Sequence, residues 1–479
     1  MANVNITIDG KNLSVPAGMT ILAAAQQNDI YIPTLCFLEK LDPHASCRMC
    51  VVEVEGARTF QHACAAKVKE GMVVHTNTEA VRASRKLTLQ LLLSDHSVDC
   101  HHCLRIGSSK CNDLDPKFCE WCFMCDCEKD GFCDLQRLAR EYEVDKLPFE
   151  QKHNTRPIDK SSVIVRNPNK CIKCKRCVDV CGKVQTVHNL AASGRGCEVV
   201  IAPAFGKSMA DSDCIGCSRC VEVCPTGAIY CEEHKDEAVY FAHREGIKTV
   251  AQVDEKLIPE LEKVWKCAPG TVTKEQIAGA LKKIGIDEIV DAADGEALAR
   301  AEAEQVLTLH LSSRPVILAQ SLAAQKFVQR NWPELMSGFV FAPSAMEAFG
   351  HVAKAAFFPE AAQVKTCHFG PVGPEAAEAE ATGCVDFAIN ARELYRIMIR
   401  TGSEPNPKRV AAFAKLPAAE LDLAFDPLFA PATWQLDGEP ETVEIKVGRK
   451  KLSCAICHNL GQARAAIDAG TFDVIRVIA

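Results

Sequence analysis

The chain has 479 residues, of which 48% are hydrophobic, and it carries a formal net charge of −7. This length allows about three domains, and the acidic balance excludes the basic surface of a nucleic-acid-binding protein. No apolar run approaches the roughly 18 residues that span a membrane. The first ten residues show no basic segment followed by an apolar one, so we expect a cytoplasmic protein. From the charge and the short apolar runs we expect no nucleic-acid partner and no membrane span.

The N-terminal segment predicts a small β-grasp unit. The alternation of Val4–Ile8 predicts a strand, Asp9-Gly10 a tight turn, and a second short strand follows. Thr20 stands where it can cap a short helix. A loop with cysteines comes next, and residues 79–95 predict a longer helix.

Cysteine dominates the composition: 18 of the 27 cysteines lie between Cys100 and Cys231. A secreted protein would use them as disulfides, whereas a cytoplasmic protein uses them for metal or redox chemistry. The absence of a recognisable signal and the tight C-x2-C spacings favour metal binding.

The first cysteine motif follows the predicted β-grasp and has the spacing C-x10-C-x2-C-x13-C, with Cys36, Cys47, Cys50 and Cys64. Four thiolates suit a 2Fe–2S cluster because soft sulfur ligands match iron. A structural zinc site is the alternative. The motif resembles the N-terminal 2Fe–2S domain shared by iron–iron hydrogenases and the large electron-input subunit of respiratory complex I.

A histidine opens the second motif: His96, Cys100 and Cys103 have the spacing H-x3-C-x2-C. In both families the 2Fe–2S domain is followed by a 4Fe–4S cluster on one His and three Cys, the last Cys after an x5 spacing and just before Leu-Gln. Cys133 fits that ending here, so the resemblance assigns the cluster to His96, Cys100, Cys103 and Cys133. Cys127 keeps the same x5 spacing to Cys133, and therefore Cys103 and Cys127 compete for one ligand position.

An insertion of about two dozen residues separates Cys103 from Cys133 and departs from the family pattern. It carries Cys111, Cys119, Cys122, Cys125 and Cys127. Cys119-x2-Cys122-x2-Cys125, with Cys111 or Cys127, predicts a further 4Fe–4S cluster. A zinc site is the alternative.

The third motif is an internal repeat of C-x2-C-x2-C-x3-C, formed by Cys171, Cys174, Cys177 and Cys181, then by Cys214, Cys217, Cys220 and Cys224. This is the signature of bacterial two-cluster ferredoxins, in which the fourth Cys of each run ligates the other cluster. We therefore expect one 4Fe–4S cluster on the first three cysteines of the first run with Cys224. A second is expected on the first three of the other run with Cys181.

After about residue 240 the pattern changes to alternating strands and helices, which predicts an α/β domain with a mainly parallel sheet. Thr273 and Gln276 match a capping box, and the helix that they open is expected to end at Gly285. The apolar run Val316–Ala319 predicts a strand.

The order of these motifs resembles the large subunit of multi-cluster iron–iron hydrogenases, and the resemblance continues in patches through the C-terminal half. It is carried there by Pro269–Thr273, Lys326–Val328, Pro333–Leu335, Phe387–Leu394 and His458–Arg464. The fold class is thus α+β and α/β multidomain. The expected domains are a 2Fe–2S ferredoxin-like domain (1–80), a His/Cys3 4Fe–4S domain with the insertion (81–150), a two-cluster ferredoxin domain (155–235) and a hydrogenase-like domain (240–479).

The ligands of the catalytic six-iron centre are where the chain departs from that family. In the aligned positions Gln320 replaces the proton-relaying cysteine and Ser321 replaces a cysteine ligand. Cys367 survives in the second motif, but Gly370 stands in place of its lysine. The chain stops at Ala479, which we expect to be just short of the third motif. We therefore expect no H-cluster.

A relocated metal site is left open by Cys454-x2-Cys457, Cys367 and Cys384. Cys454 and Cys457 lie in or just after a predicted strand, Leu452–Ile456, where they are expected to pack.

These features predict an electron-transfer subunit with one 2Fe–2S and three or four 4Fe–4S clusters and no hydrogenase activity of its own. The resemblance implies a cytoplasmic, electron-bifurcating complex that uses NAD(P)H and ferredoxin. Its other parts would be a flavin-containing NADH-dehydrogenase-like subunit, a small 2Fe–2S subunit and a separate catalytic subunit. The alternative is an active iron–iron hydrogenase with atypical ligands.

Overall fold

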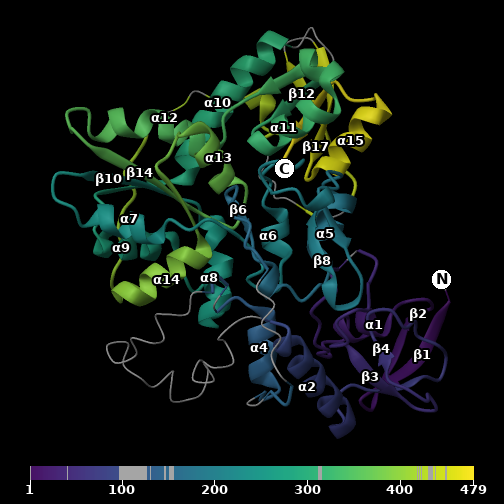
Figure 1. Ribbon diagram of the computed structural model, residues 1–479. Coiled ribbons are helices and arrows are strands. Elements are labelled where there is room, and N and C mark those ends of the chain that lie inside the picture. The colour runs from purple at the N-terminus through teal and green to yellow at the C-terminus, as the bar shows by residue number, and fades with distance from the viewer. Residues whose placement is uncertain are drawn as a thin grey trace.

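The computed structural model describes residues 2–39, 41–96, 127–129, 131–144, 147–149, 156–310, 315–417, 419, 421, 423–429, 435–436, 438–447 and 450–478. Figure 1 shows a β-grasp unit at the N-terminus, a cysteine-bearing middle segment, and an α/β part with two separate sheets. The predicted class, a mixed α/β multidomain protein, is confirmed.

The N-terminal unit is a five-stranded mixed sheet with the order β2-β1-β5-β3-β4. Its strands are β1 (Asn3–Ile8), β2 (Lys11–Pro16), β3 (Val51–Val54), β4 (Gln61–His62) and β5 (Val73–His75). Helix α1 (Ile21–Gln26) begins after Thr20, whose hydroxyl accepts a hydrogen bond from the Ala23 amide at 3.1 Å, as the sequence predicts. The central strands β1 and β5 are parallel, which is the arrangement expected of a β-grasp.

Two helices lead from this sheet towards the middle segment: α2 (Glu79–Ser94) and α4 (Asp134–Glu141). Arg85 on α2 is buried, and its guanidinium donates to the Val51 carbonyl at 2.7 Å and to the Tyr142 hydroxyl at 2.9 Å. These bonds fasten both helices to the β-grasp sheet.

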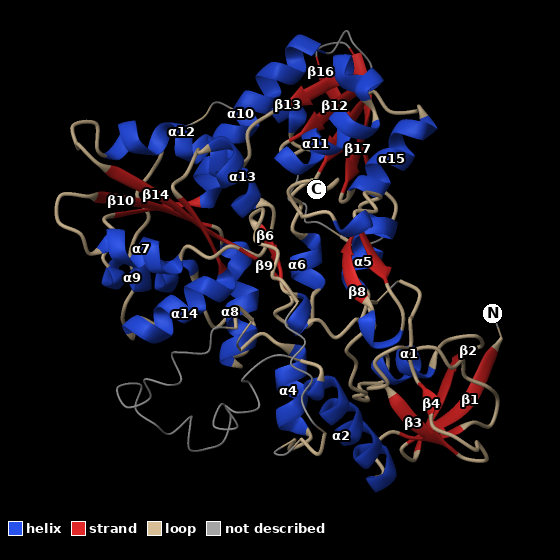
Figure 2. Ribbon diagram, in the orientation of Figure 1, coloured by secondary structure: helices blue, strands red, loops and turns tan. Residues whose placement is uncertain are grey.

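The middle segment consists of two small antiparallel sheets and short helices (Figure 2). The strands are β6 (Ile164–Arg166), paired with β9 (Ile229–Cys231), and β7 (Leu190–Ser193), paired with β8 (Val200–Pro203). The helical turns are η3 (Pro168–Lys170), α5 (Arg176–Asp179), η4 (Val180–Val184), η5 (Gly196–Glu198), η6 (Ala204–Gly206) and α6 (Arg219–Val223). The first cysteine run lies along η3, α5 and η4, and the second leads into α6.

The α/β part has two sheets. One has the order β11-β10-β14-β15 and is wholly parallel, with β10 (Lys248–Val253), β11 (Glu288–Asp291), β14 (Val364–Gly370) and β15 (Phe387–Asn390). The other has the order β13-β12-β18-β17-β16, with β12 (Val316–Ala319), β13 (Phe339–Phe341), β16 (Glu441–Val447), β17 (Lys450–Cys457) and β18 (Val474–Val477). Only β16 is antiparallel to its neighbour.

Helices cover both sheets. They are α7 (Lys235–Ala242), α8 (Ile258–Trp265), α9 (Lys274–Ile284), α10 (Ala292–His310), α11 (Leu322–Asn331), α12 (Ala345–Phe357), α13 (Glu375–Thr382), α14 (Ala391–Thr401) and α15 (Leu460–Ala469), with the short turns η7 (Glu255–Leu257), η8 (Pro333–Gly338) and η9 (Leu423–Phe425). Strand β12 matches its prediction, and α9 begins after Thr273 and ends at Gly285, whose φ is +108°. No helix in the described ranges is long and apolar enough to cross a membrane.

Helix α12 packs closely against the backbone at Cys384, and Gly350 lies at the contact. A Cβ built at Gly350 would lie 2.2 Å from the backbone oxygen of Cys384, which cannot move independently of the chain. We expect Gly350→Ala to destabilise the α/β part by about 1–3 kcal/mol. Calorimetry should show a lowered melting transition, whereas Ala355→Ser on the exposed face of α12 should not. An unchanged transition in Gly350→Ala would contradict this packing.

Candidate metal centres

The four cysteines of the first motif lie at one buried site and form two pairs. Cys36 is hydrogen-bonded to Cys47, and Cys50 to Cys64. The hydrogen bond from Cys47 lowers the pKa of Cys36 to about 5, and the bond from Cys64 lowers the pKa of Cys50 below its ordinary value. Each pair therefore favours a thiolate, the form that binds metal.

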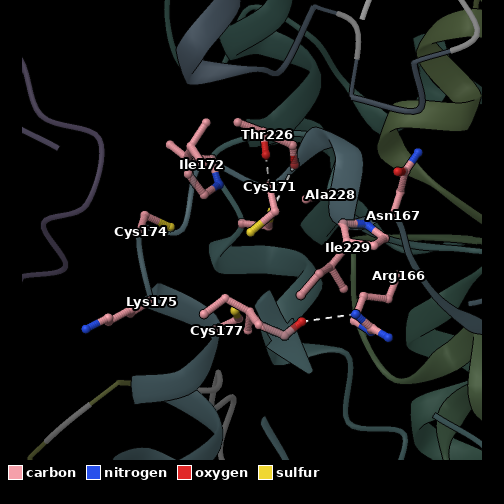
Figure 3. A pocket seen from close by; sticks show the side chains of 14 residues that line it. Arg166, Asn167, Cys171, Ile172, Cys174, Lys175, Cys177, Thr226, Ala228 and Ile229 are labelled. Atoms are coloured by element: carbon pink, nitrogen blue, oxygen red, sulfur yellow. Dashed lines mark hydrogen bonds between the residues drawn. The ribbon is translucent and has the colours of Figure 1, made fainter. Parts of the chain in front are cut away.

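Three cysteines of the first ferredoxin run and one of the second share a pocket. Figure 3 shows the side chains of Cys171, Cys174 and Cys177 around it, and Cys224 lines it as well. Burial raises the pKa of Cys171 to about 11 and that of Cys174 to about 12. These thiols are therefore neutral at pH 7 unless a metal binds, and metal binding would release their protons.

The other four ferredoxin-run cysteines come together in the same crossed manner. Burial raises the pKa of Cys181 to about 11, and the nearby Cys217 adds to that rise. Burial likewise raises the pKa of Cys214 to about 12, with further effects from Cys217 and Cys181. Cys220 lies with them and is fully buried. The Asn189 amide donates to the Cys181 sulfur at 3.3 Å. The fold thus brings each run's fourth cysteine to the first three of the other.

Cys133 lies directly against the first ferredoxin pocket. It caps α4, and its sulfur is 3.5 Å from the backbone oxygen of Pro225, the residue after Cys224. The next amide, that of Asp134, donates to the same oxygen at 2.9 Å. His96 is buried just after α2. Cys133 and Cys224 are therefore close in space although they are far apart in the sequence.

Cys127 is one of the two cysteines that compete for a ligand position beside Cys133. Cys127 is buried. Burial raises the pKa of Cys133 to about 12, and the nearby Cys127 sulfur adds to that rise. A Cβ on Gly227 would lie 2.8 Å from the Cys127 sulfur. The x5 spacing was the signal that pointed to this position. The rival Cys103 lies outside the described residues, as do Cys100, Cys111, Cys119, Cys122 and Cys125.

The candidate ligand sets are divided among three separate apolar cores. One core contains Cys36 and Cys47 together with Cys133 and Cys174. The next contains the remaining cysteines of the first ferredoxin pocket and three of the second. Cys217 packs in a third core against the sheet of β12 and β17. The sites therefore follow one another from the β-grasp to the α/β part.

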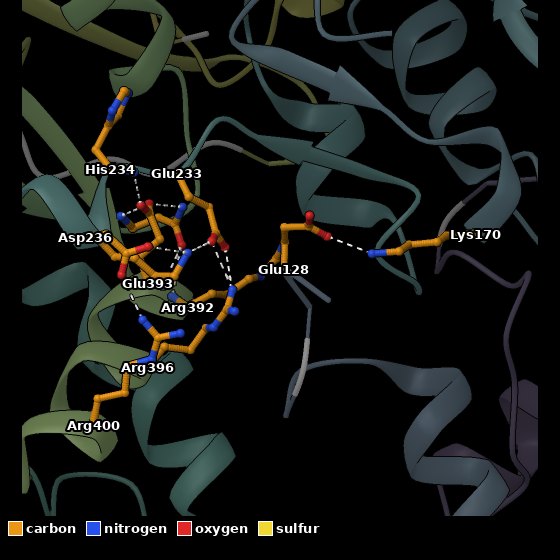
Figure 4. Close-up of polar contacts among 11 residues, drawn as sticks. Glu128, Lys170, Glu233, His234, Asp236, Arg392, Glu393, Arg396 and Arg400 are labelled. Atoms are coloured by element: carbon orange, nitrogen blue, oxygen red, sulfur yellow. Dashed lines mark hydrogen bonds and ion pairs between the residues drawn. The ribbon is translucent and has the colours of Figure 1, made fainter. Parts of the chain in front are cut away.

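Polar contacts join the middle segment to α14 (Figure 4). The Arg396 guanidinium contacts both carboxylate oxygens of Glu233, at 2.9 and 3.0 Å. Arg400 pairs at 2.8 Å with Asp236 on α7, the first helix after the middle segment. Glu393 accepts from the His234 amide at 2.7 Å, and burial raises the pKa of Glu393 to about 8. These bonds hold the cysteine-bearing segment against the α/β part.

The positions predicted to align with the hydrogenase catalytic motifs have local structural roles in the fold. Ser321 caps α11, its hydroxyl accepting from the Ala324 amide at 3.3 Å, and Gln320 precedes it. Cys367 lies in the middle of β14, in an apolar core, and burial raises its pKa to about 12. At Gly370 a Cβ would lie 2.5 Å from Nε2 of His368.

The remaining cysteines considered as a relocated site pack in apolar cores. Cys454 and Cys457 are fully buried on β17, and their side chains belong to two different cores. The expectation that these two cysteines pack is confirmed. Within the described ranges, no three His, Cys, Asp or Glu side chains converge on a point that would hold one metal ion.

Three family profiles match the chain. The family described as a 2Fe–2S iron–sulfur cluster binding domain matches residues 1–79, and that described as a 4Fe–4S binding domain matches residues 211–230. The C-terminal domain of the iron-only hydrogenase large subunit matches residues 247–426.

Solved structures with related chains include the NAD+-reducing NiFe hydrogenase in its H2-reduced state, at 27% identity. The match covers 48% of this chain and 87% of the hydrogenase chain, with a TM-score of 0.40. Apo FeFe-hydrogenase HydA1 of Chlamydomonas reinhardtii matches at 15% identity over 52% of this chain and 82% of its own, also with a TM-score of 0.40.

Relatives of two kinds match the sequence. An NADH-quinone oxidoreductase subunit of Rhizobium meliloti is 37% identical over 44% of this chain, which spans only 22% of that protein. Iron hydrogenase 1 of Clostridium pasteurianum is 26% identical over 88% of this chain and 70% of its own length. The NADP-reducing hydrogenase subunit HndD of Solidesulfovibrio fructosivorans is 31% identical over 100% of this chain and 87% of its own. The chain therefore belongs to the iron-only hydrogenase large-subunit family.

Proposed function

We propose that the chain is an electron-transfer subunit that conducts electrons through a series of iron–sulfur clusters within a larger NAD(P)H-linked oxidoreductase complex. The observation that carries this proposal is that the candidate ligand sets extend over three apolar cores in turn. The first core holds Cys36, Cys47, Cys133 and Cys174, the second holds the other cysteines of the first ferredoxin pocket, and the third holds Cys217. Packed protein without bulk water between redox centres suits electron transfer, because burial and hydrogen bonds then set each potential.

The cysteines fit the proposed clusters. Two thiol pairs suit a 2Fe–2S cluster on Cys36, Cys47, Cys50 and Cys64, because each iron there takes two terminal thiolates. The two crossed groups suit two 4Fe–4S clusters, on Cys171, Cys174, Cys177 and Cys224 and on Cys181, Cys214, Cys217 and Cys220. Such clusters would supply one-electron transfer, while the chain supplies thiolates, burial and N–H···S bonds.

A further 4Fe–4S cluster is proposed at His96 and Cys133. Between the two rivals for one of its ligands, the place of Cys127 beside Cys133 favours Cys127. Cys100 remains the proposed fourth ligand. In this arrangement Cys103 is freed for the cluster or zinc site proposed in the insertion, with Cys111, Cys119, Cys122 and Cys125.

The catalytic six-iron centre does not fit the residues at the matching positions, and we propose that this chain lacks it. Ser321 offers a hydroxyl that already caps a helix, and Cys367 faces an apolar core. Serine is a poor substitute for thiolate on this iron. The alternative is an active hydrogenase with atypical ligands, which an assay of hydrogen evolution would reveal.

The proposed partners are a flavin-containing NADH-dehydrogenase-like subunit, a small 2Fe–2S subunit, a separate catalytic subunit and ferredoxin, with electron bifurcation between them. Support comes from the relatives, which are subunits by name: an NADP-reducing hydrogenase subunit and an NADH-quinone oxidoreductase subunit. An NADPH-Fe(3+) oxidoreductase subunit alpha of Geobacter sulfurreducens, 31% identical over 43% of this chain, is a third.

Cluster content tests the proposal. One 2Fe–2S and three 4Fe–4S clusters require about 14 iron atoms per chain with matching sulfide, and a fourth 4Fe–4S cluster would raise this to about 18. Iron and sulfide should be counted after reconstitution without oxygen, and dithionite should bleach the visible absorbance. Saturation at roughly 10 iron atoms or fewer would contradict the proposed series.

A further inference from the structure

Lys129 is a buried lysine at the place where two proposed centres meet. It follows Cys127 by two residues, is 5% exposed, and donates from its Nζ to the backbone oxygen of Cys224. A Cβ on Gly227 would lie 3.7 Å from the Cβ of Lys129. The lysine therefore reaches the first ferredoxin site from the peptide segment that holds Cys127 and Cys133.

The segment from Cys224 to Gly227 is the contact between these two centres. Its Pro225 oxygen meets the Cys133 sulfur at 3.5 Å, and Gly227 faces the Cys127 sulfur. Because Nζ of Lys129 binds the first carbonyl of this same segment, its ammonium lies near ligands of both centres. The electrostatic effect of Cys224 and Cys133 on Lys129 gives the same placement.

No carboxylate of the described residues forms an ion pair with Lys129. The adjacent Glu128 pairs with Lys170 at 3.0 Å instead (Figure 4), and Asp134 is 3.6 Å from Arg176. The charged groups that act on the Lys129 ammonium are the Arg392 guanidinium, which repels it, and Cys224, Cys133 and Asp134, which attract it when they are ionised.

We propose that Lys129 sets the reduction potentials of the two centres between which it lies, the one containing Cys133 and the one containing Cys224. This rests on the proposed function. An electron added to either cluster increases the negative charge on its sulfurs. A nearby ammonium in a medium of low dielectric constant stabilises that reduced state more than the oxidised one. The lysine thereby raises both potentials.

The test is a redox titration of the full-length, anaerobically reconstituted chain at pH 7, followed by EPR. Lys129→Met removes the charge and keeps the length of the side chain. We expect both midpoint potentials to shift to more negative values, while the 2Fe–2S centre shifts less. Lys129→Gln, which can still donate a hydrogen bond to Cys224, should shift them in the same direction, and Lys129→Arg should restore them towards the wild-type values.

The matched control is the double variant Glu128→Gln/Lys170→Met, which removes a neighbouring ammonium together with its partner and should leave the potentials close to wild type. Unchanged potentials in Lys129→Met would overturn the inference. Loss of a centre from both neutral variants would also overturn it, because Lys129 would then be a structural residue. Failure of the wild-type chain to bind clusters would instead refute the proposed function.

Discussion

The purified chain is expected neither to evolve nor to consume hydrogen, even when it is produced with the maturation machinery of the six-iron centre. In the alignment that we propose, Ser321 and Cys367 stand at two of the positions where the family has cysteine ligands. The Ser321 hydroxyl is used as a helix cap, and the Cys367 thiol is buried in a packed core. The same proposed alignment puts Gln320 at the proton-relaying position, and an amide cannot relay a proton as a thiol does.

The assay is hydrogen evolution from a reduced dye, with an active iron–iron hydrogenase matured in the same cells as the positive control. The same preparation should take up electrons from a strong reductant and bleach in the visible range, which shows that its clusters are loaded. Robust evolution that Cys367→Ala abolishes would restore the chain as a hydrogenase. Evolution that Cys367→Ala leaves unchanged would point to a contaminating enzyme.

Local signals in the sequence predicted much of the fold. Thr20, Thr273 and Gly285 marked helix ends correctly because capping depends on a few neighbouring residues. The division of the α/β part into two sheets was not predicted. An apolar run such as Val316–Ala319 identifies a buried strand but not its neighbour, and β12 pairs with β18, more than 150 residues later.

The candidate site shows the same division between local and distant information. The spacing within each ferredoxin run predicted the groups that the fold brings together. The contact between the Cys133 sulfur and Pro225 was not predicted, because it joins segments 92 residues apart. Lys129 was missed for a similar reason. Its sequence neighbours give no indication that its ammonium reaches Cys224.

Cys224→Ser is expected to remove the cluster held by Cys171, Cys174 and Cys177 and to leave intact the one held by its own neighbours in sequence. The reason is the shared pocket, which Cys224 lines with three residues about fifty positions earlier. The variant should lose about four iron atoms per chain. Its EPR spectrum should match that of Cys174→Ser and differ from that of Cys217→Ser.

Cys231→Ser is the matched control, since Cys231 is also buried in the same apolar core but contacts the Ser218 hydroxyl at 3.7 Å instead of a candidate ligand set. It should keep the full iron content. If Cys224→Ser gave the spectrum of Cys217→Ser, each run would hold its own cluster and the crossed arrangement would be wrong.

The Cys224→Ser variant should also interrupt electron flow from the N-terminal centres. It would lack the cluster beside Pro225, the residue whose backbone oxygen contacts the Cys133 sulfur. Reduction of the cluster on Cys214, Cys217 and Cys220 by a flavoprotein partner should therefore slow, while its reduction by dithionite should not.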